Sequence, residues 1–129
     1  MISLSNGINM KGYTLQKSPF IVPAPGNKLI EEHFGLATNG NNDISIAHMI
    51  APPGWSEPYQ TPEFDEYVYL ISGRKQFIIN DETIILEAGQ SIKIHKNFRV
   101  QYSNPFSEPC EYIAICKPAF SMETVNREE

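Results

Sequence analysis

Glu66 is the residue of this chain with the clearest potential for chemistry, because it directly precedes the apolar stretch Tyr67 to Ile71. A carboxyl group in a partly apolar interior either acquires a raised pKa or finds a partner. Such a group can act as a general acid or base, hold a ligand's hydroxyl or amine, or coordinate a metal ion. The structural alternative is a salt bridge at the rim of the fold, for example to Arg99 or Lys93.

Strand alternation brings Tyr102 and His48 toward Glu66. Successive side chains of a strand point to opposite faces, so an inward Val100 places Tyr102 inward. In residues 44–50 the bulkier face consists of isoleucines and His48, and we expect this face to point to the core. A histidine there is either a hydrogen-bonded core residue or a catalytic group, and an inward tyrosine either donates a proton or fills volume.

The elements that must position these side chains are short strands. Ten prolines and eight glycines interrupt the chain and leave apolar stretches of only a few residues, a pattern typical of antiparallel hairpins in a sandwich or small barrel. Only the tail offers a short helical turn, with Ser121 as its cap. We predict one all-β domain with strands near residues 21–22, 29–34, 44–50, 67–71, 76–79, 83–86, 91–94, 99–103 and 111–117.

The strand that follows Glu66 has two apolar faces. Inward Val68 and Leu70 alternate with outward Tyr67, Tyr69 and Ile71. An outward row this apolar is usually covered. We expect either the N-terminal segment or a second subunit to cover it, and favour a two-fold homodimer.

Charge and composition exclude several partners. The 129 residues carry a net charge of −5 with a pI near 5.2, which disfavours binding to nucleic acid and to anionic membranes. No apolar run approaches the ~20 residues of a transmembrane helix. Because Met1 to Gly7 lack the basic and apolar regions of a signal peptide, we expect a cytoplasmic protein.

The two cysteines also fit this expectation. Cys110 and Cys116 fall on one predicted strand, where they would lie roughly 20 Å apart, too far for a disulfide within the chain. The alternative is a disulfide between two chains, and we expect reduced thiols.

Residues 54–104 resemble the double motif of the cupin superfamily. In the first motif, Gly54 is followed by Gln60-Thr61-Pro62, then by Glu66 and by Gly73 at the expected spacing. In the second motif, residues 95–104 occupy the expected frame after Gly89. The resemblance implies a double-stranded β-helix (jelly-roll) barrel, often dimeric, with its site inside the mouth. It divides residues 1–129 into N-terminal strands (1–50), motif 1 (54–73), motif 2 (89–104), and the last strand and tail (111–129).

The metal ligands of the superfamily are mostly replaced. Cupin sites typically use three histidines and a glutamate, and the matching positions here are Gln60, Pro62, Glu66 and Val100. We therefore expect no cofactor. The alternative is a divalent metal ion in a non-standard site of Glu66, Gln60 and His48. The chain also resembles a subgroup of small bacterial cupins without an assigned reaction.

Four residues complete the candidate site as ligand-binding groups: Gln60, Glu57, Trp55 and Arg99. The Gln60 amide can both donate and accept hydrogen bonds. Glu57 either lines the mouth or is a solvated loop carboxylate, and Trp55 either covers the mouth or packs beneath the proline-rich loop. The pairing of Tyr102 with Glu66 resembles metal-free sugar epimerases of the superfamily.

These features predict a barrel that binds a small polar metabolite, a sugar or organic-acid derivative. As an enzyme it would be a metal-independent isomerase, epimerase or lyase with Glu66, Tyr102 and His48 as catalytic groups. The alternatives are a metal-dependent cupin and a non-enzymatic ligand sensor or accessory protein.

Overall fold

The computed structural model describes residues 11–129, so the interpretation of Met1 to Gly7 lies outside the described residues. Within this part the regular secondary structure is almost entirely β. Its elements are β1 (Phe20–Ile21), β2 (Leu29–Phe34), α1 (Leu36–Asn39), β3 (Ser45–Ala51), β4 (Asp65–Ser72), β5 (Arg74–Ile79), β6 (Glu82–Glu87), β7 (Ser91–Ile94), β8 (Val100–Ser103) and β9 (Cys110–Lys117).

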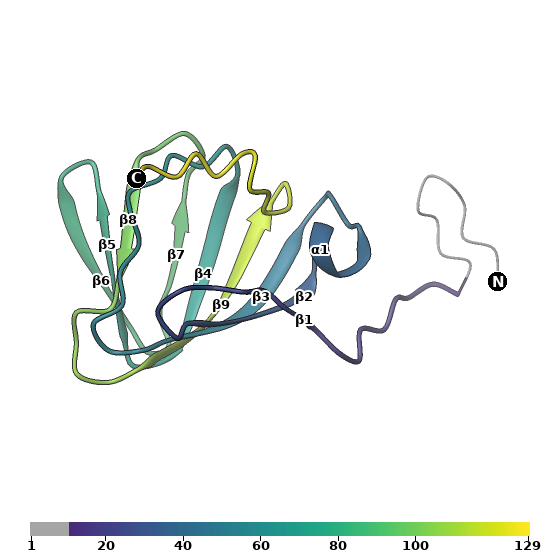
Figure 1. Ribbon diagram of the computed structural model, residues 1–129, viewed down its shortest axis with the longest axis horizontal. Helices are drawn as coiled ribbons and strands as arrows, with labels where there is room; N and C mark the ends of the chain where they lie inside the picture. The colour runs from purple at the N-terminus through teal and green to yellow at the C-terminus, as the bar shows by residue number, and fades with distance from the viewer. Residues whose placement is uncertain (1–10) are drawn as a thin grey trace.

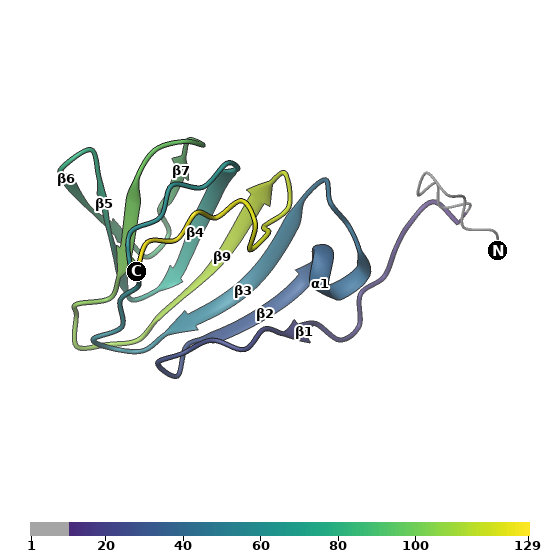
Figure 2. The same ribbon diagram turned by 45° about the horizontal axis from the view of Figure 1, so that its top comes forward.

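Two antiparallel sheets form the two sides of the domain (Figures 1 and 2). The large sheet has the strand order β1-β2-β3-β9-β4-β7, and the small sheet has the order β6-β5-β8. The C-terminal segment runs from the end of β9 toward β8 (Figure 1). It pairs with the loop before β4, where Glu63 N donates to Thr124 O and Glu128 N donates to Tyr59 O. The tail thus ties the two sheets together at one end.

The predicted strands correspond closely to the observed ones, and the all-β prediction is confirmed. Thr124 N and Val125 N both donate to Ser121 O, which makes the single turn expected in the tail. Helix α1 is the described element that the sequence pattern did not predict. It lies between two glycines with positive φ, Gly35 and Gly40, and its four residues are too few to give a helical period.

The alternation predicted for β4 is confirmed. Val68 and Leu70 are fully buried, whereas Tyr67, Tyr69 and Ile71 are 39%, 50% and 42% exposed. Strand β8 behaves in the same way, with Val100 and Tyr102 buried in the core. Both strands therefore direct their predicted residues to the interior.

The face predicted for β3 is wrong. Ser45, Ala47 and Ala51 are the buried residues of this strand, and the register pairs Ala47 with Ala114 of β9. Small side chains face inward here because the interior holds a cavity, which bulky isoleucines would fill. The isoleucines lie on the outer face instead.

His48 therefore lies on the outer face of the large sheet, between two carboxylates. Its Nδ1 is 2.7 Å from Glu31 Oε1 on β2, and its Nε2 is 2.6 Å from Glu111 Oε2 on β9. The hydrogen bond to Glu111, followed by that to Glu31, raises the pKa of His48. This arrangement is that of a structural histidine that bridges three strands.

The two remaining sequence expectations concern the cysteines and membranes. Cys110 and Cys116 are both buried free thiols, as expected. Among residues 11–129, no helix is long and apolar enough to cross a membrane.

Gly73 and Gly89, the motif glycines on either side of the β5–β6 hairpin, provide a matched test of the fold. Both have positive φ, but a Cβ at Gly73 would overlap the Pro109 carbonyl and lie 2.9 Å from Cys110 Cα, whereas a Cβ at Gly89 meets nothing within 4 Å. Gly89→Ala should cost about 1 kcal/mol, the left-handed backbone penalty. Gly73→Ala should cost about 3 kcal/mol, near the upper end of ordinary single substitutions. Urea denaturation measures both, and equal costs would contradict the close packing at Gly73.

The bridge at His48 makes stability depend on pH. Because the pKa of His48 is raised in the folded state, its stabilisation is fully present below the ordinary histidine pKa and is lost as pH rises through the raised value. His48→Gln should therefore lower the free energy of unfolding by less than about 1 kcal/mol at pH 5, as for a partly exposed ion pair, and have little effect at pH 9. Glu111→Gln should flatten the same pH profile. A loss that grows with pH would contradict this assignment.

Candidate functional site

A cavity of about 480 Å³ receives side chains from both sheets. Part of its wall is apolar, including Ala47 and Met49 of β3 and Ala114 of β9. Polar side chains interrupt this wall, among them Lys28, Glu32, Glu57, Gln60, Glu66, Lys75, Tyr102, Tyr112 and Arg127. A largely apolar cavity with a few convergent polar groups is the usual form of a small-molecule site.

Glu66 and Tyr102 meet inside this cavity, as the sequence predicted. Glu66 is the second residue of β4 in the large sheet, and Tyr102 is the third residue of β8 in the small sheet. Tyr102 Oη donates a hydrogen bond of 2.6 Å to Glu66 Oε1. The two groups thus form a polar contact across the barrel interior.

Burial dominates the electrostatics of this pair. Desolvation raises the pKa of Glu66, although the hydrogen bond from Tyr102 and the charges of Lys75 and Lys28 act in the opposite direction. Desolvation also raises the pKa of Tyr102 well above its ordinary value. Glu66 is therefore a carboxyl group able to gain and lose a proton nearer to neutral pH, and Tyr102 stays a hydrogen-bond donor.

Lys75 is a buried cavity residue that the sequence analysis missed. It lies on β5, where Lys75 and Phe77 alternate inward, and only 2% of its surface is exposed. Desolvation, followed by the charge of Lys28, lowers the pKa of Lys75 to about 7. Strand alternation from the inward Phe77 would have placed Lys75 in the interior as well. The predicted strand began one residue later, at Gln76, so Lys75 was not considered.

A second set of interacting polar side chains, besides Glu66 and Tyr102, comes from the loop before β4, the residue before β2 and the C-terminal tail. Glu57 pairs with Lys28 (Oε2–Nζ 3.6 Å) and with Arg127 (Oε1–Nη2 3.7 Å). Arg127 Nε also donates to Gln60 Oε1 at 3.2 Å. Neither Lys28 nor Arg127 belongs to a strand, so alternation gave no signal for them.

Two predicted ligand-binding residues lie outside the cavity lining. Trp55 is buried in the core, and its ring contacts Lys28 and Lys75 with Nζ-to-centroid distances of 4.2 and 4.7 Å. Of the two roles considered for Trp55, covering the mouth or packing in the interior, this position corresponds to packing. Arg99 lies on the surface, where it pairs with Glu128 at 2.8 Å and stacks on Tyr59.

The metal alternative does not fit the cavity. His48 lies on the opposite face of the sheet, with Glu31 and Glu111. The remaining donors are the Glu66 carboxylate and the Gln60 amide, which share the cavity with Lys28, Lys75 and Arg127. Basic side chains beside the Glu66 carboxylate oppose the binding of a divalent cation, and the described residues contain no group of three or more His, Cys, Asp or Glu side chains that could hold a metal ion.

Comparison with known proteins identifies the family. Residues 47–116 match the family model described as "Cupin domain". The chain is also 38% identical over 117 residues to a Myxococcus xanthus protein named "Endoribonuclease YbeY", and the match covers 91% of this chain but 40% of that protein. The chain therefore spans about two-fifths of the length of this relative.

Solved structures support the same fold. An RmlC-like cupin with a double-stranded β-helix from Methanocaldococcus jannaschii superposes with a TM-score of 0.66 at 16% identity, over 83% of this chain and 94% of that one. Oxalate decarboxylase from Bacillus subtilis gives a TM-score of 0.69 at 15% identity, over 89% of this chain and 33% of that one. The chain belongs to the cupin domain family, and its two sheets form the double-stranded β-helix barrel of that superfamily.

Proposed function

We propose that this chain binds a small organic acid in its cavity and moves a proton on it with Glu66 and Tyr102, without a metal ion. The observation that carries the proposal is the 2.6 Å hydrogen bond between these two groups inside the cavity. Paired acid–base groups in a largely apolar pocket are suited to proton transfer.

The charges of the cavity favour an acid over a neutral sugar. Three basic side chains, Lys28, Lys75 and Arg127, line it together with three carboxyl groups, Glu32, Glu57 and Glu66. Because burial raises the pKa of Glu66, protonation of this group leaves the three basic side chains in excess of the two other carboxyl groups. A ligand carboxylate would compensate that excess.

Tyr112 supports a ligand with a hydrogen-bonding group. Tyr112 on β9 is one of the residues that line the cavity, and its hydroxyl is the buried side-chain polar atom of the described residues that has no hydrogen-bond partner. Buried hydroxyls nearly always have one. A ligand oxygen would fill this role.

The chemistry is isomerisation, epimerisation or elimination next to a carbonyl group. Glu66 as the carboxylate removes a proton from the carbon next to the carbonyl, and the electron pair of that C–H bond moves toward the carbonyl oxygen. Tyr102 or a nearby lysine donates a hydrogen bond to this oxygen. Glu66 then returns the proton, or a leaving group departs from the neighbouring carbon.

The names of the relatives do not decide the reaction. Oxalate decarboxylase acts, by its name, on an organic acid, but the likeness at 15% identity shows only the fold. The endoribonuclease name belongs to a protein of which this chain matches 40%, and a net charge of −5 disfavours RNA. We therefore rest the proposal on the cavity alone.

Proton exchange tests the proposal. The wild-type chain is incubated in D₂O with pyruvate or 2-oxobutyrate, and NMR measures deuterium incorporation next to the carbonyl. Glu66→Gln should slow exchange by about 100-fold or more, the contribution of a general base, and Tyr102→Phe should slow it less. Exposed Glu82→Gln is the matched control and should leave the rate unchanged. Undiminished exchange in Glu66→Gln would contradict the role of Glu66.

The same experiment separates the non-enzymatic alternative. A ligand sensor or accessory protein would be stabilised against thermal unfolding by the acid but would return it without deuterium. That result would keep the binding part of the proposal and reject the catalytic part.

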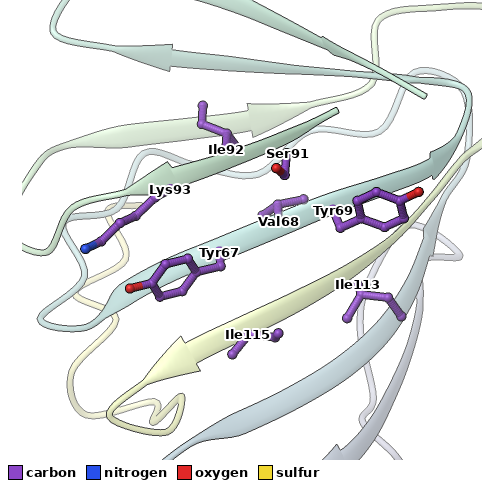
Figure 3. Close-up of a pocket in the computed structure, with 8 residues that line it drawn as sticks. All are labelled: Tyr67, Val68, Tyr69, Ser91, Ile92, Lys93, Ile113 and Ile115. Carbon is purple, nitrogen blue, oxygen red and sulfur yellow. The ribbon is translucent and has the colours of Figure 1, made fainter. Parts of the chain in front are cut away.

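We also propose a two-fold homodimer through the outer face of the large sheet. A groove of about 380 Å³ runs along this face. Figure 3 shows the rings of Tyr67 and Tyr69 on β4 beside Ile113 and Ile115 on β9. Such an apolar surface favours a covering partner.

Charge complementarity supports a second copy as that partner. Glu31 on β2 and Lys93 on β7 lie near opposite edges of this face, with β9 near its centre. A two-fold axis along β9 would bring Glu31 of one copy toward Lys93 of the other, as an isologous interface requires.

Sedimentation equilibrium tests the dimer. Tyr69→Glu places a charge in the apolar centre and should shift the chain to monomer. Ile85→Glu is the control, because Ile85 is similarly exposed, at 44% against 50%, but lies on β6 of the small sheet. A wild-type chain that remains monomeric at high concentration would contradict the proposed interface.

A further inference from the structure

Lys75 is a buried lysine without an ion-pair partner in the described part of the chain. Its Nζ stands among four aromatic rings, at centroid distances of 4.2 Å (Tyr112), 4.7 Å (Trp55), 5.2 Å (Tyr102) and 5.4 Å (Phe77). The other cavity lysine, Lys28, has an ion pair with Glu57 at 3.6 Å. Aromatic faces stabilise an ammonium only partly when it leaves water.

The position of Lys75 is therefore costly for a merely structural side chain. A neutral side chain of similar size would fill the same part of the core without a buried amine. An unpaired buried charge is among the main causes of large destabilisation. Lysines placed in this way in other proteins commonly serve as nucleophiles, because desolvation leaves the amine as the free base.

We propose that Lys75 forms an imine with the carbonyl carbon of a small 2-oxo acid held in the cavity. This inference rests on the proposed function, since the ligand occupies the same cavity, and it adds a covalent attachment that proton transfer by Glu66 does not require.

The groups around Lys75 supply the protons that the reaction needs. The Nζ lone pair forms the new C–N bond, and the carbonyl π electrons move to the oxygen, which takes a proton from the Glu66 carboxylic acid. The Glu66 carboxylate then removes a proton from the new C–N⁺ group, and the carbinolamine results. Glu66 returns this proton to the hydroxyl, which leaves as water while the nitrogen lone pair forms the C=N bond. No oxidant or reductant is involved.

The protonation states agree with this sequence. The pKa of Lys75 is lowered to about 7, first by desolvation and then by the charge of Lys28, while Cys110, Glu66 and Glu57 act to raise it. At pH 7 the free-base fraction of Lys75 is about a thousand times that of an exposed lysine. A ligand carboxylate would be compensated by Lys28 and Arg127, which also line the cavity.

An imine would also assist the proposed proton transfer. The C=N⁺H group withdraws electrons more strongly than the carbonyl it replaces, so it acidifies the hydrogen on the neighbouring carbon. Glu66 then acts on a more acidic C–H bond.

Reductive trapping tests the inference. The full chain is incubated at pH 7 with glyoxylate or pyruvate and sodium cyanoborohydride, and peptide mass mapping locates the product. We expect one site, Lys75, to gain the mass of the acid less one oxygen atom, as a secondary amine. The rate of trapping should reach half its maximum near pH 7, following the pKa of Lys75.

Two substitutions make the test specific. Lys75→Met keeps a long side chain, removes the buried amine and should abolish the adduct while the chain stays folded. Exposed Lys96→Met should leave the adduct unchanged.

The failures are distinguishable. Adducts spread over exposed lysines, or none with either acid, would overturn the imine proposal. If deuterium exchange persists in that case, the proposed function stands without Lys75 as a nucleophile. If exchange and thermal stabilisation by the acids are absent as well, the proposed function fails too.

Discussion

The burial of several ionisable groups in one barrel interior is the constraint on which the rest of the structure depends. Glu66, Lys75 and Lys28 would each prefer water, and the interior satisfies them only in part. Tyr102 supplies a hydrogen bond to Glu66, Glu57 compensates Lys28, and aromatic rings surround Lys75. Because a cost of this kind is seldom retained for stability alone, the arrangement supports the proposed ligand site.

The fold explains how these ionisable side chains meet in one cavity. Tyr102 and Lys75 belong to the small sheet and Glu66 to the large sheet, so their contact depends on the two sheets facing each other. Small residues such as Ala47 on β3 and Ala114 on β9 leave space for the cavity between the two sheets. The C-terminal tail adds Arg127, whose contacts with Gln60 and Glu57 link the tail to this end of the cavity.

The sequence predicted the part of the site that strand alternation controls. Glu66 and Tyr102 follow from the period of β4 and β8, and the motif spacing supports the same frame. His48 was assigned to the wrong face, because side-chain bulk was taken as the sign of an inward face, whereas a cavity needs small walls such as Ala47. Lys75 was missed because the predicted strand began at Gln76. Lys28 and Arg127 lie in segments without a period, so only the tertiary structure brings them to the cavity.

The central claim concerns the environment of one carboxyl group, and its titration tests that claim most directly. Labelling the chain with ¹³C-glutamate and following the Glu66 Cδ resonance against pH measures the pKa of this group, with Glu66→Gln used to assign the signal. The account predicts a pKa above the ordinary glutamate range, since desolvation outweighs the hydrogen bond from Tyr102 and the charges of both lysines. An ordinary or lowered pKa would contradict it, because Glu66 would then be a fixed carboxylate paired with the cavity lysines.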